Sequence, residues 1–152
     1  MHSLNKLFLL FINSQKKISD WFDRLLPAKY RIDGYRNFSS AILPRYIHEN
    51  SVIYDIGGGK NPYMTNEMKS GLNCRYIGLD INKNELNVAP HGAYDKTIAA
   101  DISDYKGSED GDLVICMALL EHVKDVNAAL VGIRSCLKPG GLCALFVPSK
   151  NG

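Results

Sequence analysis

Five short runs in the second two thirds of the chain are apolar and rich in β-branched or aromatic residues, a composition typical of β-strands. They occupy residues 51–56, 75–80, 96–101, 112–117 and 142–147. The third run, KTIAAD, is the weakest, whereas DLVICM and LCALFV are apolar on both faces. Runs of that last kind favour a parallel sheet that helices cover on both sides.

Apolar residues spaced three and four positions apart predict helices between these runs. The clearest helix follows Asp125, a plausible N-cap. Its expected apolar face consists of Val126, Leu130, Ile133 and Leu137. Lys138 and Gly140 come next, as expected where a helix ends.

Two shorter helices complete the alternation. Asn61 and Pro62 form a reasonable N-cap and first turn, with Gly71 as the stop. The segment 82–88 predicts one or two further turns. Strand and helix in alternation predict an α/β fold with a doubly wound, mostly parallel sheet over residues 51–152.

The first fifty residues predict a helical extension, a cap on the core. Apolar positions at helical spacing run through 4–26, Pro27 limits that helix, and 38–47 predicts a second short helix. The first helix is expected to pack on the domain or on a second copy of the chain. Its lysine-flanked apolar stripe makes peripheral membrane contact the alternative.

Composition narrows the classes of function. The chain has 152 residues and a net charge of +2, with no long basic run, which argues against a nucleic-acid partner. The cysteines form no CxxC or metal-ligand pattern, so no metal site is expected and a reduced, cytoplasmic setting is the simplest prediction.

Acidic residues and glycines gather where the predicted strands end. Asp55 and Gly57, Gly58 and Gly59 follow the first strand, Asp80 ends the second and Asp101 ends the third. In an open α/β sheet, ligands bind outside the carboxyl ends of the strands. These side chains are therefore the candidates for a binding site.

The set of acids discriminates between nucleotide ligands. The dinucleotide fingerprint needs a glycine where Pro62 stands, and the charge of Asp55 would repel a pyrophosphate. Asp80 suits ribose hydroxyls, Asp101 could accept from the amine of an adenine, and a carboxylate at Asp55 would favour a cationic group. A ligand with an ammonium, a sulfonium, a ribose and an adenine fits: S-adenosylmethionine.

The order of motifs carries a family resemblance. The runs DIGGGKNP, YIGLDIN, AADISD, DLVICMALLEHV and LKPGGLCALFVPS, within residues 51–149, resemble class I S-adenosylmethionine-dependent methyltransferases, most nearly those of type 11. The resemblance implies a Rossmann-like core and methyl transfer as the activity.

The resemblance also implies roles for single residues. It implies that Asp55 and the loop of Gly57, Gly58 and Gly59 hold the methionine part of the cofactor. It implies that Asp80, with Ile81 beside it, binds the ribose. It implies that Asp101 and Ile102 contact the adenine and that Met117 lies beside the cofactor.

Two departures from the family pattern bear on activity. Asn61 stands where the glycine loop often has a further glycine, a change that Asn tolerates. Family members also continue beyond the fifth strand, so we expect a shortened core whose last strand is an exposed edge. Such an edge favours self-association.

Three functions remain open on the sequence alone: a shortened methyltransferase, a non-catalytic module that holds the cofactor, and a nicotinamide-dependent oxidoreductase. No catalytic base is identifiable, although Glu121 and His122 follow the fourth strand, where a structural or cofactor-edge role is favoured. The methyl acceptor is expected to be a small molecule or a glycan-type intermediate.

Overall fold

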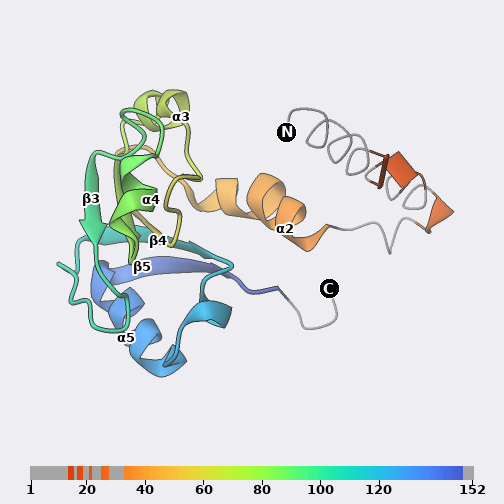
Figure 1. Cartoon of the computed structure of the whole chain (residues 1–152). Coiled ribbons are helices and arrows are strands. Elements are labelled where there is room, and N and C mark those ends of the chain that lie inside the picture. The colour runs from red at the N-terminus through yellow and green to blue at the C-terminus, as the bar shows by residue number, and fades with distance from the viewer. Residues whose placement is uncertain (1–13, 16, 19–20, 22–24, 28–32, 149–152) are drawn as a thin grey trace, which may run out of the picture. The chain divides into compact units, whose positions relative to one another are not determined.

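The computed structural model describes residues 14–15, 17–18, 21, 25–27 and 33–148. The chain divides into two units, residues 1–37 and 38–152, which are described separately (Figure 1). The first unit contains the short helix α2 (Gly34–Asn37), where the Arg36 N–H donates to Asp33 Oδ1 at 3.0 Å.

The predicted N-terminal helix is helical wherever it is described between residues 14 and 25. Its first part, 4–13, lies outside the described residues. Within the described part of the chain, no helix is long and apolar enough to cross a bilayer.

The second unit is built on a parallel sheet of five strands in the order β3-β2-β1-β4-β5. The strands are β1 (Val52–Ile56), β2 (Arg75–Asp80), β3 (Lys96–Ala99), β4 (Gly111–Met117) and β5 (Leu137–Phe146). This confirms the predicted doubly wound α/β fold. The chain reverses its direction of winding between β1 and β4, where this architecture places its ligands.

Three helices connect the strands: α3 (Asn66–Gly71), α4 (Lys83–Asn87) and α5 (Val126–Cys136). The predicted cap of α5 is confirmed, because Asp125 Oδ1 accepts from the Ala128 N–H at 3.0 Å. The predicted start of α3 was wrong. Thr65, whose hydroxyl accepts from the Met68 N–H, caps that helix, and the residues before it form a loop.

The end of α5 also differs from the prediction. The helix stops at Cys136, and β5 begins directly at Leu137 with an irregular register opposite Gly111 and Leu113. Gly140 has a φ of +81°, so it permits a backbone distortion near the start of β5. It does not end α5.

Two apolar clusters cover the two faces of the sheet. On one face, α5 packs Ala129, Ile133 and Cys136 against buried strand residues. On the other, the short helices η2 (Phe38–Ile42) and η3 (Leu43–Tyr46) contribute, with Leu43 fully buried. The helical prediction for 38–47 is thereby confirmed, and both faces of the central strands are buried as their composition indicated.

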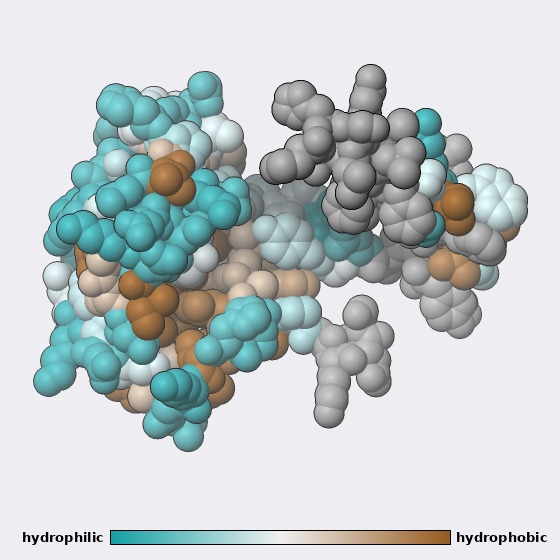
Figure 2. All heavy atoms as spheres, viewed as in Figure 1, coloured by the Kyte–Doolittle hydropathy of each residue, from teal (hydrophilic) through white to brown (hydrophobic). Residues whose placement is uncertain are grey.

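Strand β5 is an edge of the sheet, as predicted. Leu142 and Leu145 of β5, and Val147 just after it, are exposed. Figure 2 shows apolar side chains between hydrophilic areas in the region where β5 lies in Figure 1.

Gly132 fixes how closely α5 approaches the sheet. A Cβ added at Gly132 would lie 1.9 Å from the carbonyl oxygen of Ile102, which stands three residues after the end of β3. The helix therefore packs directly on the backbone that carries a predicted site residue.

We predict that Gly132→Ala lowers the free energy of unfolding by about 1–3 kcal/mol, because overpacking outweighs the roughly 1 kcal/mol gain in helix propensity. Gly71→Ala is the matched control, since a Cβ there meets no atom within 4 Å. Urea denaturation measures both. Equal stability of the two variants would contradict the close approach.

Candidate functional site

The carboxyl ends of β1, β2 and β3 surround one cavity of about 260 Å³. Five of the residues predicted from the sequence line it together, namely Gly57, Asp80, Ile81, Asp101 and Ile102. The remaining lining residues are Ile56, Leu79, Ala100, Leu119, His122, Val123 and Lys124. Two carboxylates therefore stand beside a largely apolar wall.

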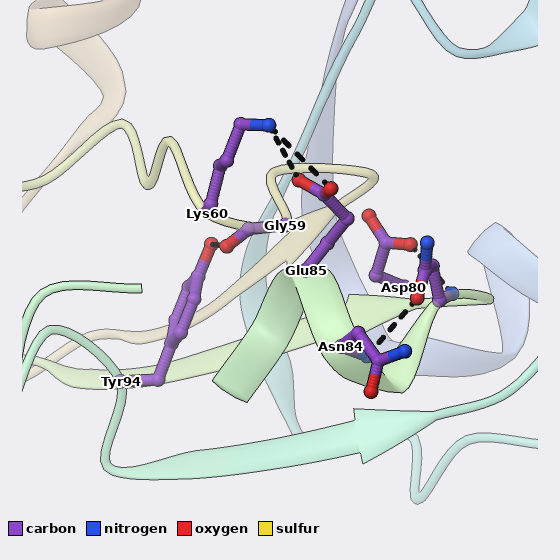
Figure 3. A network of polar contacts seen from close by, with 7 residues as sticks. Gly59, Lys60, Asp80, Asn84, Glu85 and Tyr94 are labelled. Atoms are coloured by element: carbon purple, nitrogen blue, oxygen red, sulfur yellow. Dashed lines mark hydrogen bonds and ion pairs between the residues drawn. The ribbon is translucent and has the colours of Figure 1, made fainter. Parts of the chain in front are cut away.

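Asp80 is held at the end of β2 by the start of α4. Its Oδ1 accepts from the Asn82 N–H at 2.8 Å, and Asn82 in turn caps α4 through the Asn84 N–H at 3.0 Å (Figure 3). A Cβ added at Gly59 would lie 3.0 Å from Asp80 Oδ2, so this carboxylate borders the glycine loop. The local hydrogen bonds orient the side chain.

Asp101 is held in the same way after β3. Its Oδ1 accepts from the Ser103 N–H at 2.9 Å, while the next residue, Ile102, is buried beneath α5. An oriented carboxylate next to an apolar side chain is suited to a flat heterocycle that carries an amine.

The segment after β4 closes the cavity on another side. Ala118 has a φ of +53°, and its N–H donates to the carbonyl of Phe146 at 2.8 Å. The turn leads into the short helix η4 (Leu120–His122), and His122 lines the cavity. Met117 does not line it and packs against the cluster on the opposite face, so its predicted place beside the cofactor stays a prediction.

Asp55 lies beneath the glycine loop and is 3% exposed. Its Oδ2 accepts from the Tyr76 hydroxyl, from the Tyr63 N–H at 3.1 Å and from the Tyr94 hydroxyl at 3.4 Å. Burial raises the pKa of the Asp55 carboxyl above its ordinary value, although these three hydrogen bonds act to lower it. Burial, and next the charge of Asp55, raise the pKa values of Tyr76 and Tyr94.

The loop of three glycines rests directly on this carboxylate. A Cβ added at Gly58 would lie 2.5 Å from Asp55 Oδ2, so only glycine permits the approach. Gly57, with a φ of +80°, donates its N–H to the carbonyl oxygen of Leu79 in β2 at 2.8 Å. Asp55 and Gly58 support the site from below and do not line the cavity.

The sequence did not identify several of these residues. Tyr94 lies outside every motif, whereas Tyr76, Leu119 and Val123 lie inside motif runs that give them no individual role. Gly78, which stands in the middle of a strand, was a signal for a close approach that could have been used. Among the residues that the structure describes, no group of three His, Cys, Asp or Glu could hold a metal ion.

Comparison with known proteins identifies the family. The model of a family described as a methyltransferase domain matches residues 54–145, more than half of the chain. A ubiquinone biosynthesis O-methyltransferase from Cereibacter sphaeroides is 29% identical over 157 residues, which cover 99% of this chain and 56% of that protein. A protein of the same name from Hydrogenovibrio crunogenus is 30% identical over 128 residues, which cover 80% of this chain and 49% of that protein.

Solved structures agree with the fold. A putative S-adenosyl-L-methionine-dependent methyltransferase from Methanococcus maripaludis has a TM-score of 0.60 at 18% identity, with 73% of this chain and 54% of that chain covered. Phosphoethanolamine N-methyltransferase 2 from Haemonchus contortus, in complex with phosphomonomethylethanolamine and S-adenosylhomocysteine, has a TM-score of 0.59 at 26% identity, with 70% and 27% covered.

The chain spans about half the length of the curated relatives that it matches. The match to the family model and the order of the motifs favour a methyltransferase over the dinucleotide alternative, whereas the parallel five-stranded sheet is common to both. The protein belongs to the methyltransferase domain family, the class I S-adenosylmethionine-dependent methyltransferases that its motifs resemble.

Proposed function

We propose that this protein holds S-adenosylmethionine at the carboxyl ends of β1, β2 and β3 and serves methyl transfer to a small organic acceptor. The observation that carries the proposal is the pair of oriented carboxylates, Asp80 and Asp101, on one apolar cavity beside Gly57. Their spacing along consecutive parallel strands suits a nucleoside, with its hydroxyls on one acid and its base by the other.

The residues present fit the cofactor by their chemistry. Asp80 accepts from the ribose hydroxyls, Asp101 from the adenine amine, and Ile81 and Ile102 supply apolar contact. When bound, the cofactor would supply an electrophilic methyl group, because its sulfur is positively charged and would keep the C–S electron pair as the leaving group. The two carboxylates of the lining, Asp80 and Asp101, outnumber its one lysine, Lys124, and so favour such a cation.

The protein itself contributes binding, orientation and exclusion of water. Leu119 and Val123 give the cavity an apolar wall, which suits a site that excludes water. Among the lining residues not assigned to the cofactor, His122 could take a proton from an acceptor, and a base is needed only for a weakly nucleophilic acceptor.

Information on the chemical class of the methyl acceptor comes from the similar proteins alone. The named relatives include O- and N-methyltransferases, and the phosphoethanolamine enzyme is a complex with a small phosphorylated amine. This supports a small molecule as the acceptor class. The glycan-type acceptor, self-association through β5 and a cytoplasmic location stay predictions.

We further propose that one face of the segment 14–27 contacts an anionic lipid surface. Ile18, Trp21 and Leu25 share one helical face, and each is at least half exposed. Residues 1–37 hold seven Lys and Arg against three Asp, although the whole chain has a net charge of only +2. An apolar face within a basic segment suits the interface of an anionic membrane.

For the cofactor, we predict that Asp80→Ala weakens binding of S-adenosylhomocysteine by roughly 1.5–3 kcal/mol, because hydrogen bonds to a charged acceptor are lost. Isothermal titration calorimetry measures the affinity, with NAD titrated alongside. Asp104→Ala, at an exposed acid outside the cavity, is the control. Undiminished affinity in Asp80→Ala rejects the ribose assignment, and tighter binding of NAD rejects the cofactor.

For the membrane, we predict that the full chain floats with phosphatidylcholine vesicles that contain phosphatidylglycerol and not with phosphatidylcholine alone. Ile18→Asp and Leu25→Asp should abolish flotation, because a charge on the apolar face opposes insertion. Val131→Asp, at an exposed apolar position of α5, should leave it unchanged. If both N-terminal variants still float, or if the wild-type protein does not float, the proposed lipid contact is contradicted.

A further inference from the structure

The hydroxyl of Tyr94 lies between a buried carboxylate and the glycine loop. It is 3.4 Å from Asp55 Oδ2. It is also 3.2 Å from the carbonyl oxygen of Gly59 (Figure 3). A phenol has one proton to donate, so Tyr94 shares it between these two acceptors. Tyr94 is not among the residues that line the cavity.

The position of Tyr94 is built by its neighbours. A Cβ at Gly78 would lie 2.8 Å from the Tyr94 ring, so this glycine in β2 leaves the space that the ring fills. The ring stacks on Tyr76 with centroids 5.2 Å apart. Asp95 anchors the backbone, because it donates its N–H to the Tyr76 carbonyl and accepts from the Tyr76 N–H, both at 2.8 Å.

Apart from Tyr94, the glycine loop is held by the Gly57 N–H, which donates to the Leu79 carbonyl at 2.8 Å, and by an exposed ion pair between Lys60 Nζ and Glu85 Oε2 at 3.2 Å (Figure 3). Gly57 and Gly59 have positive φ values, and one turn is closed by the Asn61 N–H donating to the Gly58 carbonyl at 2.9 Å. Glycines have many backbone conformations to lose when they are ordered. A single hydrogen bond to the Gly59 carbonyl can therefore shift the balance between ordered and open loop conformations.

We propose that Tyr94 is a positioning residue that, with Asp55 as its anchor, holds the glycine loop from behind and so sets the affinity for the methionine half of the cofactor. The inference rests on the proposed function. It gives Asp55 a supporting role: all three of its hydrogen-bond donors reach Oδ2 and come from the protein itself.

The first test needs no ligand. Hydrogen–deuterium exchange of the full-length Tyr94→Phe variant should be faster than wild type in the peptide that covers residues 57–61. The phenylalanine keeps the ring in its space and removes only the hydroxyl. Tyr105→Phe, a half-buried tyrosine of the other core cluster, is the matched control and should leave that peptide unchanged. Unaltered exchange in Tyr94→Phe overturns the proposal.

The second test separates positioning from general stability. Tyr94→Phe should bind S-adenosylhomocysteine about three- to tenfold more weakly, the worth of one hydrogen bond, while adenosine affinity stays within about twofold. Equal losses for both ligands, or a lowered melting temperature with unchanged S-adenosylhomocysteine affinity, overturn the proposal. Wild-type protein that binds neither ligand refutes the proposed function instead, and the exchange measurement still decides whether Tyr94 orders the loop.

Discussion

The buried carboxylate of Asp55 is the constraint on which the arrangement of the site depends. A carboxylate removed from water is costly unless it is hydrogen-bonded, and here the donors come from three separate segments. Tyr63 belongs to the loop after β1, Tyr76 to β2, and Tyr94 to the loop before β3. Satisfying one charge therefore draws three segments together beneath the glycine loop.

Asp55, Asp80 and Asp101 all lie at or near the end of a strand, but they have different roles. Asp80 and Asp101 each accept one local N–H and keep a place on the cavity rim. Asp55, on the central strand, is enclosed by aromatic residues and the loop. We infer that Asp80 and Asp101 bind the ligand, whereas the buried Asp55 holds in place the glycine loop that approaches the ligand.

The sequence predicted much of this fold because its signals are local. Strand positions, the Asp125 cap and the acids at the strand ends depend on composition and on neighbouring residues. The start of α3 was missed because Pro62 resembles a first helical turn, whereas the side chain of Thr65 makes the actual cap. Tyr94 could not be inferred, since its role depends on space at Gly78 and on an acid 39 residues away.

A crystal structure of the full chain with S-adenosylhomocysteine tests the central claim most directly. The account predicts the ribose hydroxyls on Asp80, the adenine beside Asp101 and Ile102, and Asp55 Oδ2 still bonded to Tyr76 and Tyr94. A ligand bound elsewhere, or a ligand in the cavity that contacts neither rim acid, would contradict it.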